Sequence, residues 1–140
     1  MENTRPQTVP HLCGIKIMVV DDEPDIGEIL TRFLGQKGYE VVSFTEGRKA
    51  LEYLKSNPVH LVLTDINMLE MNGAEVIRSA RELKPGISFL VMGSRLGTGE
   101  IEQDLAGLGF LDYIHKPFEL AAIAKAIEQK LAAARPAINT

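Results

Sequence analysis

The chain has 140 residues, of which 45% are hydrophobic, with a formal net charge of −4 and one cysteine. This length and apolar content predict one domain with a sizeable core, and the absence of a basic run argues against nucleic-acid binding by this segment. No apolar stretch approaches the roughly 20 residues that cross a bilayer, and the lone Cys13 cannot form an internal disulfide. We therefore expect a cytoplasmic protein that does not enter a membrane.

Short apolar runs divide the chain at regular intervals. Residues 1–14 form a polar leader that lacks the apolar core of a secretory signal. Compact apolar runs that end at turn residues predict buried strands. The predicted strands are Lys16–Val20, Glu40–Phe44, Leu61–Thr64, Ser88–Met92 and Phe110–Ile114. We expect the folded domain to span residues 15–133, and residues 134–140 to be a tail or the start of a linker.

Segments with helical periodicity lie between these strands. Pro24 occupies a favourable first-turn position, and Gly38 stands where a left-handed residue usually closes a helix. Five helices are predicted. The first begins at Pro24 and is closed by Gly38, and the second contains Ala50–Leu54 and stops before Asn57–Pro58. The others are Gly73–Leu83, a helix near Gly99–Leu108 that is capped by Gly109, and a last helix from Glu119 to about Ala133. Strands that alternate with helices predict an α/β fold with a parallel sheet covered on both sides.

Acidic residues follow two of the predicted strands. Asp21 and Asp22 come directly after the first strand, and Asp65 closes the third. In open parallel sheets, ligands bind outside the carboxyl ends of the strands. Three carboxylates in one crevice repel each other unless a cation joins them, and hard oxygen ligands favour Mg²⁺. The sequence therefore predicts a magnesium site at this edge of the sheet.

Four motifs in this order resemble the receiver domains of two-component response regulators. They are Val-Val-Asp-Asp-Glu-Pro at residues 19–24, Asp65 at the end of a strand, Asn72–Gly73, and Asp-Tyr-Ile-His-Lys-Pro-Phe at residues 112–118. The resemblance covers about residues 15–133. It implies a flavodoxin-like (βα)5 fold, a three-layer sandwich with strand order 2-1-3-4-5.

The resemblance also implies a role for each polar residue. Asp65 would be the phosphoryl acceptor, Asp22 a direct ligand of Mg²⁺, and Asp21 a metal-site acid that acts largely through water. Asn67 would offer its backbone carbonyl to the metal, and Lys116 would pair with the phosphoryl group. The metal and the compact ammonium would offset the repulsion between an attacking carboxylate and a phosphodonor.

The remaining family positions concern the response to phosphorylation. Tyr113 would be the aromatic switch, and the peptide bond before Pro117 would be cis. The family has Thr or Ser directly after the fourth strand, whereas this chain has Gly93 there with Ser94 next to it. Either Ser94 supplies the hydroxyl or the hydroxyl is missing. A second departure is Leu69, where Pro is common; we expect it to loosen the loop without altering the chemistry.

Three functions are compatible with these residues. The leading one is a signalling switch that takes a phosphoryl group from a sensor histidine kinase or a histidine phosphotransfer protein, and then acts on an effector protein or output domain. The switch would catalyse only its own phosphoryl transfer and the slow hydrolysis of its aspartyl phosphate. Gly93 suggests an alternative, a degenerate receiver that binds partners independently of phosphate. A phosphohydrolase of the haloacid dehalogenase type fits poorly, because Asn67 stands where its general acid would be.

Overall fold

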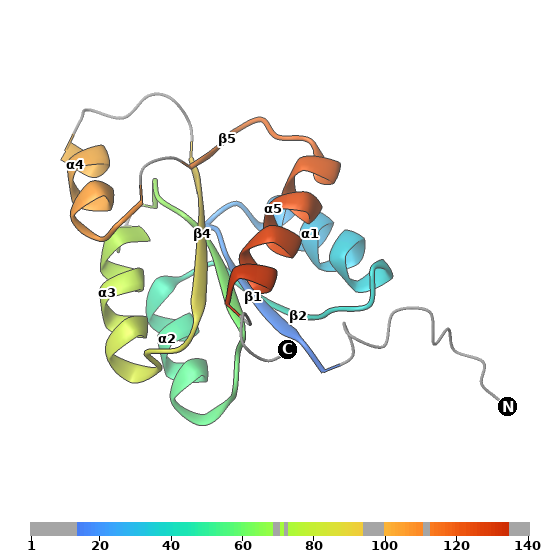
Figure 1. Ribbon diagram of the computed structural model, residues 1–140, viewed down its shortest axis with the longest axis horizontal. Helices are drawn as coiled ribbons and strands as arrows, with labels where there is room; N and C mark the ends of the chain where they lie inside the picture. Colours follow the sequence, from blue (N-terminus) through green and yellow to red (C-terminus); the bar gives the residue numbers. More distant parts are fainter. Residues whose placement is uncertain (1–13, 69–70, 72, 94–99, 111–112, 135–140) are drawn as a thin grey trace, which may run out of the picture.

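One parallel five-stranded sheet organises the chain, with strand order β2-β1-β3-β4-β5 (Figure 1). The computed structural model describes residues 14–68, 71, 73–93, 100–110 and 113–134. The strands are β1 Lys16–Val20, β2 Glu40–Phe44, β3 Leu61–Asp65, β4 Ser88–Gly93 and β5 Ile114–His115. The strand order expected from the resemblance is confirmed, and it makes β1 and β3 the central neighbours at which the order reverses.

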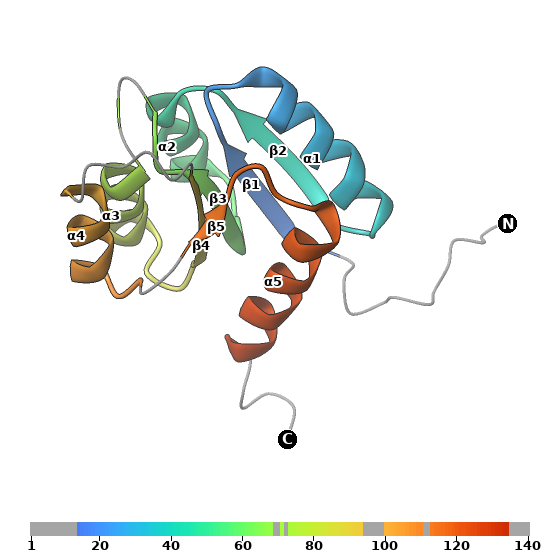
Figure 2. The same cartoon turned by 90° about the horizontal axis from the view of Figure 1, so that it is seen from above.

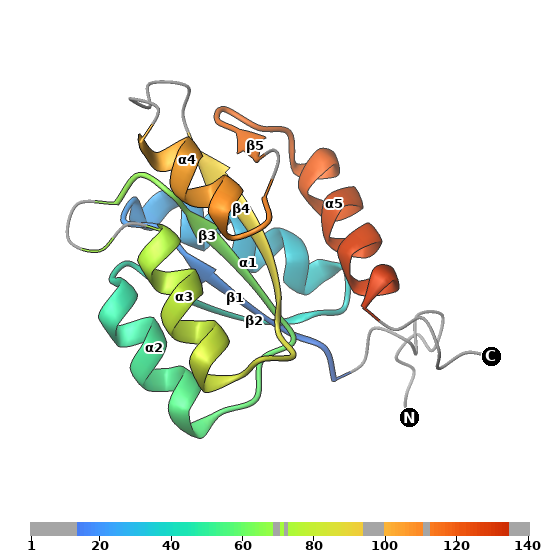
Figure 3. The same cartoon turned by 60° about the vertical axis from the view of Figure 1, so that its left-hand side comes forward.

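Five helices connect the strands and form two outer layers. They are α1 Pro24–Gln36, α2 Gly47–Ser56, α3 Gly73–Leu83, α4 Glu100–Gly107 and α5 Leu120–Ala133. Helices α1 and α5 cover one face of the sheet, and α2, α3 and α4 lie on the other (Figures 1, 2 and 3). The predicted three-layer sandwich is therefore confirmed. Within the described part of the chain, none of these helices is long and apolar enough to span a membrane.

Alternate residues of the central strands supply two separate cores. On β1, Ile17 and Val19 pack with the cluster of α1 and α5, which includes Leu30 and Ile127. Met18, between them on the strand, joins the opposite cluster of α2 and α3. Successive side chains of a strand point to opposite faces, so a strand that is buried on both faces reads as a continuous apolar run. This explains why β1 and β3 were recognisable from sequence.

The register of β1 on β3 brings their carboxyl ends together. Val20 pairs with Thr64, so Asp21, which follows β1, lies beside Asp65, the last residue of β3. The backbone N–H of Asp21 donates to the carbonyl of Phe44 at 3.0 Å, which continues the pairing with β2 for one residue beyond the strand. The acids thus begin at the point where the sheet ends.

The fifth strand was predicted over Phe110–Ile114, and this boundary is wrong. Strand β5 is only Ile114–His115, while Phe110 belongs to the turn that closes α4. Gly109 has a φ of +98°, and the N–H of Phe110 donates to the carbonyl of Leu105 at 2.9 Å. This is the hydrogen-bond pattern of a glycine-terminated helix, and it takes Phe110 out of the strand. Residues 111–112 lie outside the described part of the chain.

Candidate functional site

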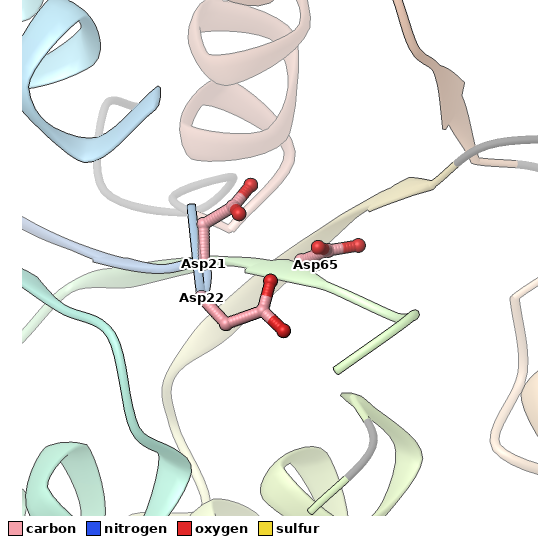
Figure 4. A group of neighbouring side chains, drawn as sticks. All are labelled: Asp21, Asp22 and Asp65. Carbon is pink, nitrogen blue, oxygen red and sulfur yellow. The ribbon is translucent and has the colours of Figure 1, made fainter. Parts of the chain in front are cut away.

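Three carboxylates converge at the carboxyl ends of β1 and β3 (Figure 4). Asp21, Asp22 and Asp65 each offer an oxygen, and these oxygens all lie within 4.8 Å of one another. Asp21 and Asp65 are 1% and 3% exposed, whereas Asp22 is half-buried. The structure therefore brings together the three acids that the sequence singled out. Two of them are shielded from water, which strengthens the electrostatic interactions among them.

Lys116 is the cation of this cluster. Its Nζ lies 2.7 Å from Oδ2 of Asp21 and 3.1 Å from Oδ2 of Asp65. The backbone N–H of Lys116 donates to the carbonyl of Gly93 at 2.8 Å, so the edge pairing of β5 on β4 aims the side chain at the acids. The peptide bond between Lys116 and Pro117 is cis.

A fourth carboxylate at the site was missed by the sequence analysis. Oε1 of Glu23 lies 3.4 Å from Nζ of Lys116, and the backbone N–H of Glu23 donates to Oδ1 of Asp21 at 2.9 Å. Glu23 is exposed and directly precedes α1. Its position next to the two aspartates was the only available indication, because no pattern distinguishes it from an ordinary helix-start acid.

Burial and neighbouring charges shift the pKa values of Asp21 and Lys116. Burial raises the pKa of Asp21, and the charge of Asp65 adds to this; the hydrogen bonds from Lys116 and from the backbone of Glu23 act in the opposite direction. Burial opposes the charged form of Lys116, but the hydrogen bond to Asp21 and the charges of Asp65 and Asp21 outweigh it, so the pKa of Lys116 is raised. The cluster therefore favours an added positive charge.

The loop after β3 holds Asp65 from its other side. The backbone N–H of Asn67 donates to Oδ1 of Asp65 at 3.0 Å. Helix α3 begins close by at Gly73, where a Cβ atom would lie only 2.7 Å from the carbonyl oxygen of Asp65 and 2.8 Å from Cα of Ile66. Only glycine permits this approach. Leu69 and Asn72 lie outside the described residues.

The two predicted switch positions that the structure describes, Gly93 and Tyr113, lie near each other. Gly93 is the buried last residue of β4, and Tyr113 is half-buried with its ring centroid 4.5 Å from that of His115. A Cβ atom on Gly93 would lie 3.5 Å from Cε2 of Tyr113. The third predicted switch position, Ser94, lies outside the described residues.

Comparison with known families decides the identity of this fold and site. The family model described as "Response regulator receiver domain" matches residues 17–128. The chain belongs to this family. Receiver domains are the signalling domains of two-component response regulators, and the resemblance inferred from the sequence motifs is thereby confirmed.

Several receiver proteins are similar to this chain over most of its length. It is 34% identical over 119 residues to the transcriptional regulatory protein ZraR of Escherichia coli K12, and 32% identical over 119 residues to the response regulator receiver protein CpdR of Brucella abortus. Each match covers 85% of this chain; it covers 27% of ZraR and 98% of CpdR. The chain thus spans about a quarter of the length of ZraR and nearly all of CpdR.

Solved receiver structures have the same architecture. A CheY-like receiver domain protein from Methanospirillum hungatei superimposes with a TM-score of 0.80 at 26% identity, over 86% of this chain and 96% of that one. The chemotaxis protein CheY4 of Vibrio cholerae superimposes with a TM-score of 0.75 at 24% identity, over 83% of this chain and 98% of that one. The second likeness concerns the fold alone.

The acid cluster of this receiver fits the Mg²⁺ that the family typically binds. Carboxylate oxygens are hard ligands of the kind that Mg²⁺ prefers. The ammonium of Lys116 contacts Asp21, Glu23 and Asp65, and Asp22 adds a further negative charge to the cluster. The cluster also leaves Asp22 half-buried and accessible. The donor set and the excess of negative charge both suit a divalent cation.

Proposed function

We propose that this receiver accepts a phosphoryl group on Asp65 from the phosphohistidine of a sensor histidine kinase or a histidine phosphotransfer protein, in the cytoplasm. A carboxylate oxygen of Asp65 attacks phosphorus, and the bond to the histidine nitrogen breaks as the new bond forms. Subsequent attack of water on the aspartyl phosphate returns Asp65 to its free state. The observation that carries the proposal is the Lys116 ammonium 3.1 Å from Oδ2 of Asp65, beside two further acids.

Each polar residue of the cluster has a defined part in this proposal. Asp22 would be the direct ligand of Mg²⁺ together with Asp65, while Asp21 would act largely through water and Asn67 would offer its backbone carbonyl. When bound, Mg²⁺ would offset the repulsion between the acceptor carboxylate and the phosphoryl oxygens. Lys116 supplies a positive charge from β5, and because an ammonium is a compact point charge it can pair with a phosphoryl oxygen.

The partners belong to the proposal as well. Phosphorylation would alter contacts with an effector protein or an output domain, without nucleic-acid binding by residues 15–133 themselves. In this role the protein is a switch and turns over no separate substrate. A degenerate receiver that ignores phosphate remains the second candidate, because Gly93 provides no hydroxyl at the end of β4.

Intact-mass spectrometry tests the acceptor assignment. Treatment with acetyl phosphate and Mg²⁺ should add one phosphoryl group to the wild-type protein and none to Asp65→Asn. Asp25→Asn is the matched control, because Asp25 is an exposed acid in the first turn of α1 and should be modified like the wild type. The same mass gain in Asp65→Asn would refute the assignment. Partner binding that is identical with and without the modification would favour the degenerate receiver.

A further inference from the structure

Gly93 lies in a space that another side chain has already filled. A Cβ atom built on Gly93 would overlap Cγ2 of Ile66, and it would lie 3.1 Å from Oδ1 of Asn67. The backbone φ of Gly93 is not in the left-handed region, so glycine is required here for room and not for conformation. Ile66, the residue after β3, and Gly93, the last residue of β4, therefore form a large–small pair. A Thr or Ser side chain at position 93 would displace Ile66.

Ile66 is connected to both the acceptor and the switch region. It directly follows Asp65 in the chain and is 2% exposed. Its N–H donates to the carbonyl of Met92 at 2.8 Å, and its carbonyl accepts from Gly73 at 3.3 Å. A change in the backbone of Asp65 must therefore move Ile66, because close-packed interiors transmit displacement.

The volume beside Gly93 has a second neighbour, the ring of Tyr113. The γ2-methyl of Ile66 and Cε2 of Tyr113 both border the position that a side chain on Gly93 would occupy. The carbonyl of Gly93 also accepts from the backbone N–H of Lys116, whose Nζ contacts Asp65. Ile66, the aromatic ring and the backbone of the lysine thus all meet at this glycine.

We propose that the γ2-methyl of Ile66 is the positioning group that transmits the state of Asp65 to Tyr113, in place of a hydroxyl at position 93. The proposal rests on the function of Asp65 as the phosphoryl acceptor. Phosphorylation would change the relative stability of two arrangements of Asp65 and Ile66. The arrangement that moves the γ2-methyl against the Gly93 backbone also repacks the Tyr113 ring.

The first test is a packing test that needs no phosphorylation. Gly93→Ala is introduced into two backgrounds, the wild type and Ile66→Ala, and the urea midpoint of unfolding is measured in each. In the wild type the substitution should lower the midpoint. In Ile66→Ala the decrease should be less than half as large, because the alanine methyl at position 93 enters the space that the Ile66 side chain has left. An equal decrease in both backgrounds would show that Ile66 does not fill the space at Gly93, and this would overturn the proposal.

The second test measures transmission to the ring. The chain has three tyrosines, so ¹³C-labelled tyrosine gives few ring signals in NMR, and Tyr113→Phe assigns the one required. Beryllofluoride, which mimics the phosphoryl group on Asp65, should shift the Tyr113 signal fully in the wild type and in Ile66→Val, which keeps the γ2-methyl. The shift should fall by at least half in Ile66→Leu, which keeps the volume but has no γ2-methyl.

The two proposals fail in different ways. A beryllofluoride adduct with a full Tyr113 shift in Ile66→Leu would overturn the role of Ile66 and leave Asp65 as the acceptor. No adduct in the wild-type protein would refute the acceptor assignment, and the transmission through Ile66 with it. An adduct in every variant, with the shift reduced only where the γ2-methyl is absent, is the result that we expect.

Discussion

Lys116 lies closer to Asp21 than to Asp65, with Nζ 2.7 Å from Oδ2 of the first and 3.1 Å from Oδ2 of the second. Asp21 is almost fully buried, and this burial raises its pKa. Because it is the nearer acid, Asp21 holds the ammonium beside the proposed acceptor. Within the proposed function, Asp21 would position the lysine, Asp22 would be the accessible metal ligand and Asp65 would be the nucleophile.

Replacing Lys116 should separate metal binding from phosphoryl transfer. Lys116→Met removes the positive charge next to the acids, so Mg²⁺ should bind more tightly, on the order of tenfold, while the yield of the beryllofluoride adduct falls. Magnesium titration monitored by NMR, together with adduct formation, measures both effects. Lys125→Met on the exposed side of α5 is the control and should change neither. Weaker Mg²⁺ binding in Lys116→Met would contradict the electrostatic argument.

Asp21→Asn should stabilise the metal-free fold in a pH-dependent way. The folded-state pKa of Asp21 is raised above its ordinary value of 3.8, so the native state binds more protons than the unfolded state as the pH rises past 3.8. Stability attributable to Asp21 is therefore full below 3.8 and is lost as the pH rises through the folded pKa. The stability advantage of Asp21→Asn over the wild type should therefore be absent at acidic pH and should grow as the pH rises through the folded-state pKa.

Urea unfolding of both proteins across this pH range, in the presence of a chelator, measures the difference. Saturating Mg²⁺ should reduce or reverse the advantage of Asp21→Asn, because the wild-type site binds the cation and the variant loses a carboxylate from it. If Asp21→Asn is less stable than the wild type at neutral pH without metal, the ion pair of Asp21 with Lys116 stabilises the fold by more than the burial of Asp21 destabilises it. The predicted stabilisation by Asp21→Asn would then be wrong.

The convergence of Asp21 and Asp65 was predictable because parallel strands end at the same edge of a sheet. Each acid followed a short apolar run, and such runs are typical of central strands buried on both faces. Lys116 could be placed near them only through the family resemblance. It is 95 residues from Asp21 in sequence, and no periodicity in a chain encodes a contact of that separation.

Features that depend on close packing were not predictable. The run from Phe110 to Ile114 has the composition of a strand, but the closing turn of α4 at Gly109 takes up Phe110 through its hydrogen bond to Leu105. At Gly93 the sequence indicated either that Ser94 supplies the switch hydroxyl or that the hydroxyl is missing, and both alternatives stay open. The structure adds that Ile66 occupies the space beside Gly93, and a sequence pattern contains no information about which neighbour fills a gap.

Asp22 should be the acid on which metal affinity depends most directly, because it is half-buried at the open side of the cluster. Asp22→Asn removes one negative charge and one hard oxygen ligand, and it should weaken Mg²⁺ binding roughly tenfold or more. Asp25→Asn, four residues from Asp21 on the exposed start of α1, should remain within about twofold of the wild type by the same electrostatic reasoning. Equal weakening in the two variants would indicate a general charge effect and not ligation.

The approach of α3 to Asp65 gives a prediction about stability and chemistry together. At Gly73 an added methyl would meet backbone atoms, at 2.7 Å from the Asp65 carbonyl oxygen and 2.8 Å from Cα of Ile66, and backbone cannot move aside as a flexible side chain can. Gly73→Ala should therefore destabilise the fold by roughly 1–3 kcal/mol and lower the yield of the beryllofluoride adduct at Asp65.

Gly35→Ala is the matched control, since nothing lies within 4 Å of its Cβ position in α1; it should stabilise the protein by roughly 0.5–1 kcal/mol and leave adduct formation unchanged. Urea unfolding and intact-mass measurement on the two variants test the pair. Wild-type stability in Gly73→Ala would mean that α3 can withdraw from the site without cost, and the loop after β3 would then not be held as tightly as these distances require.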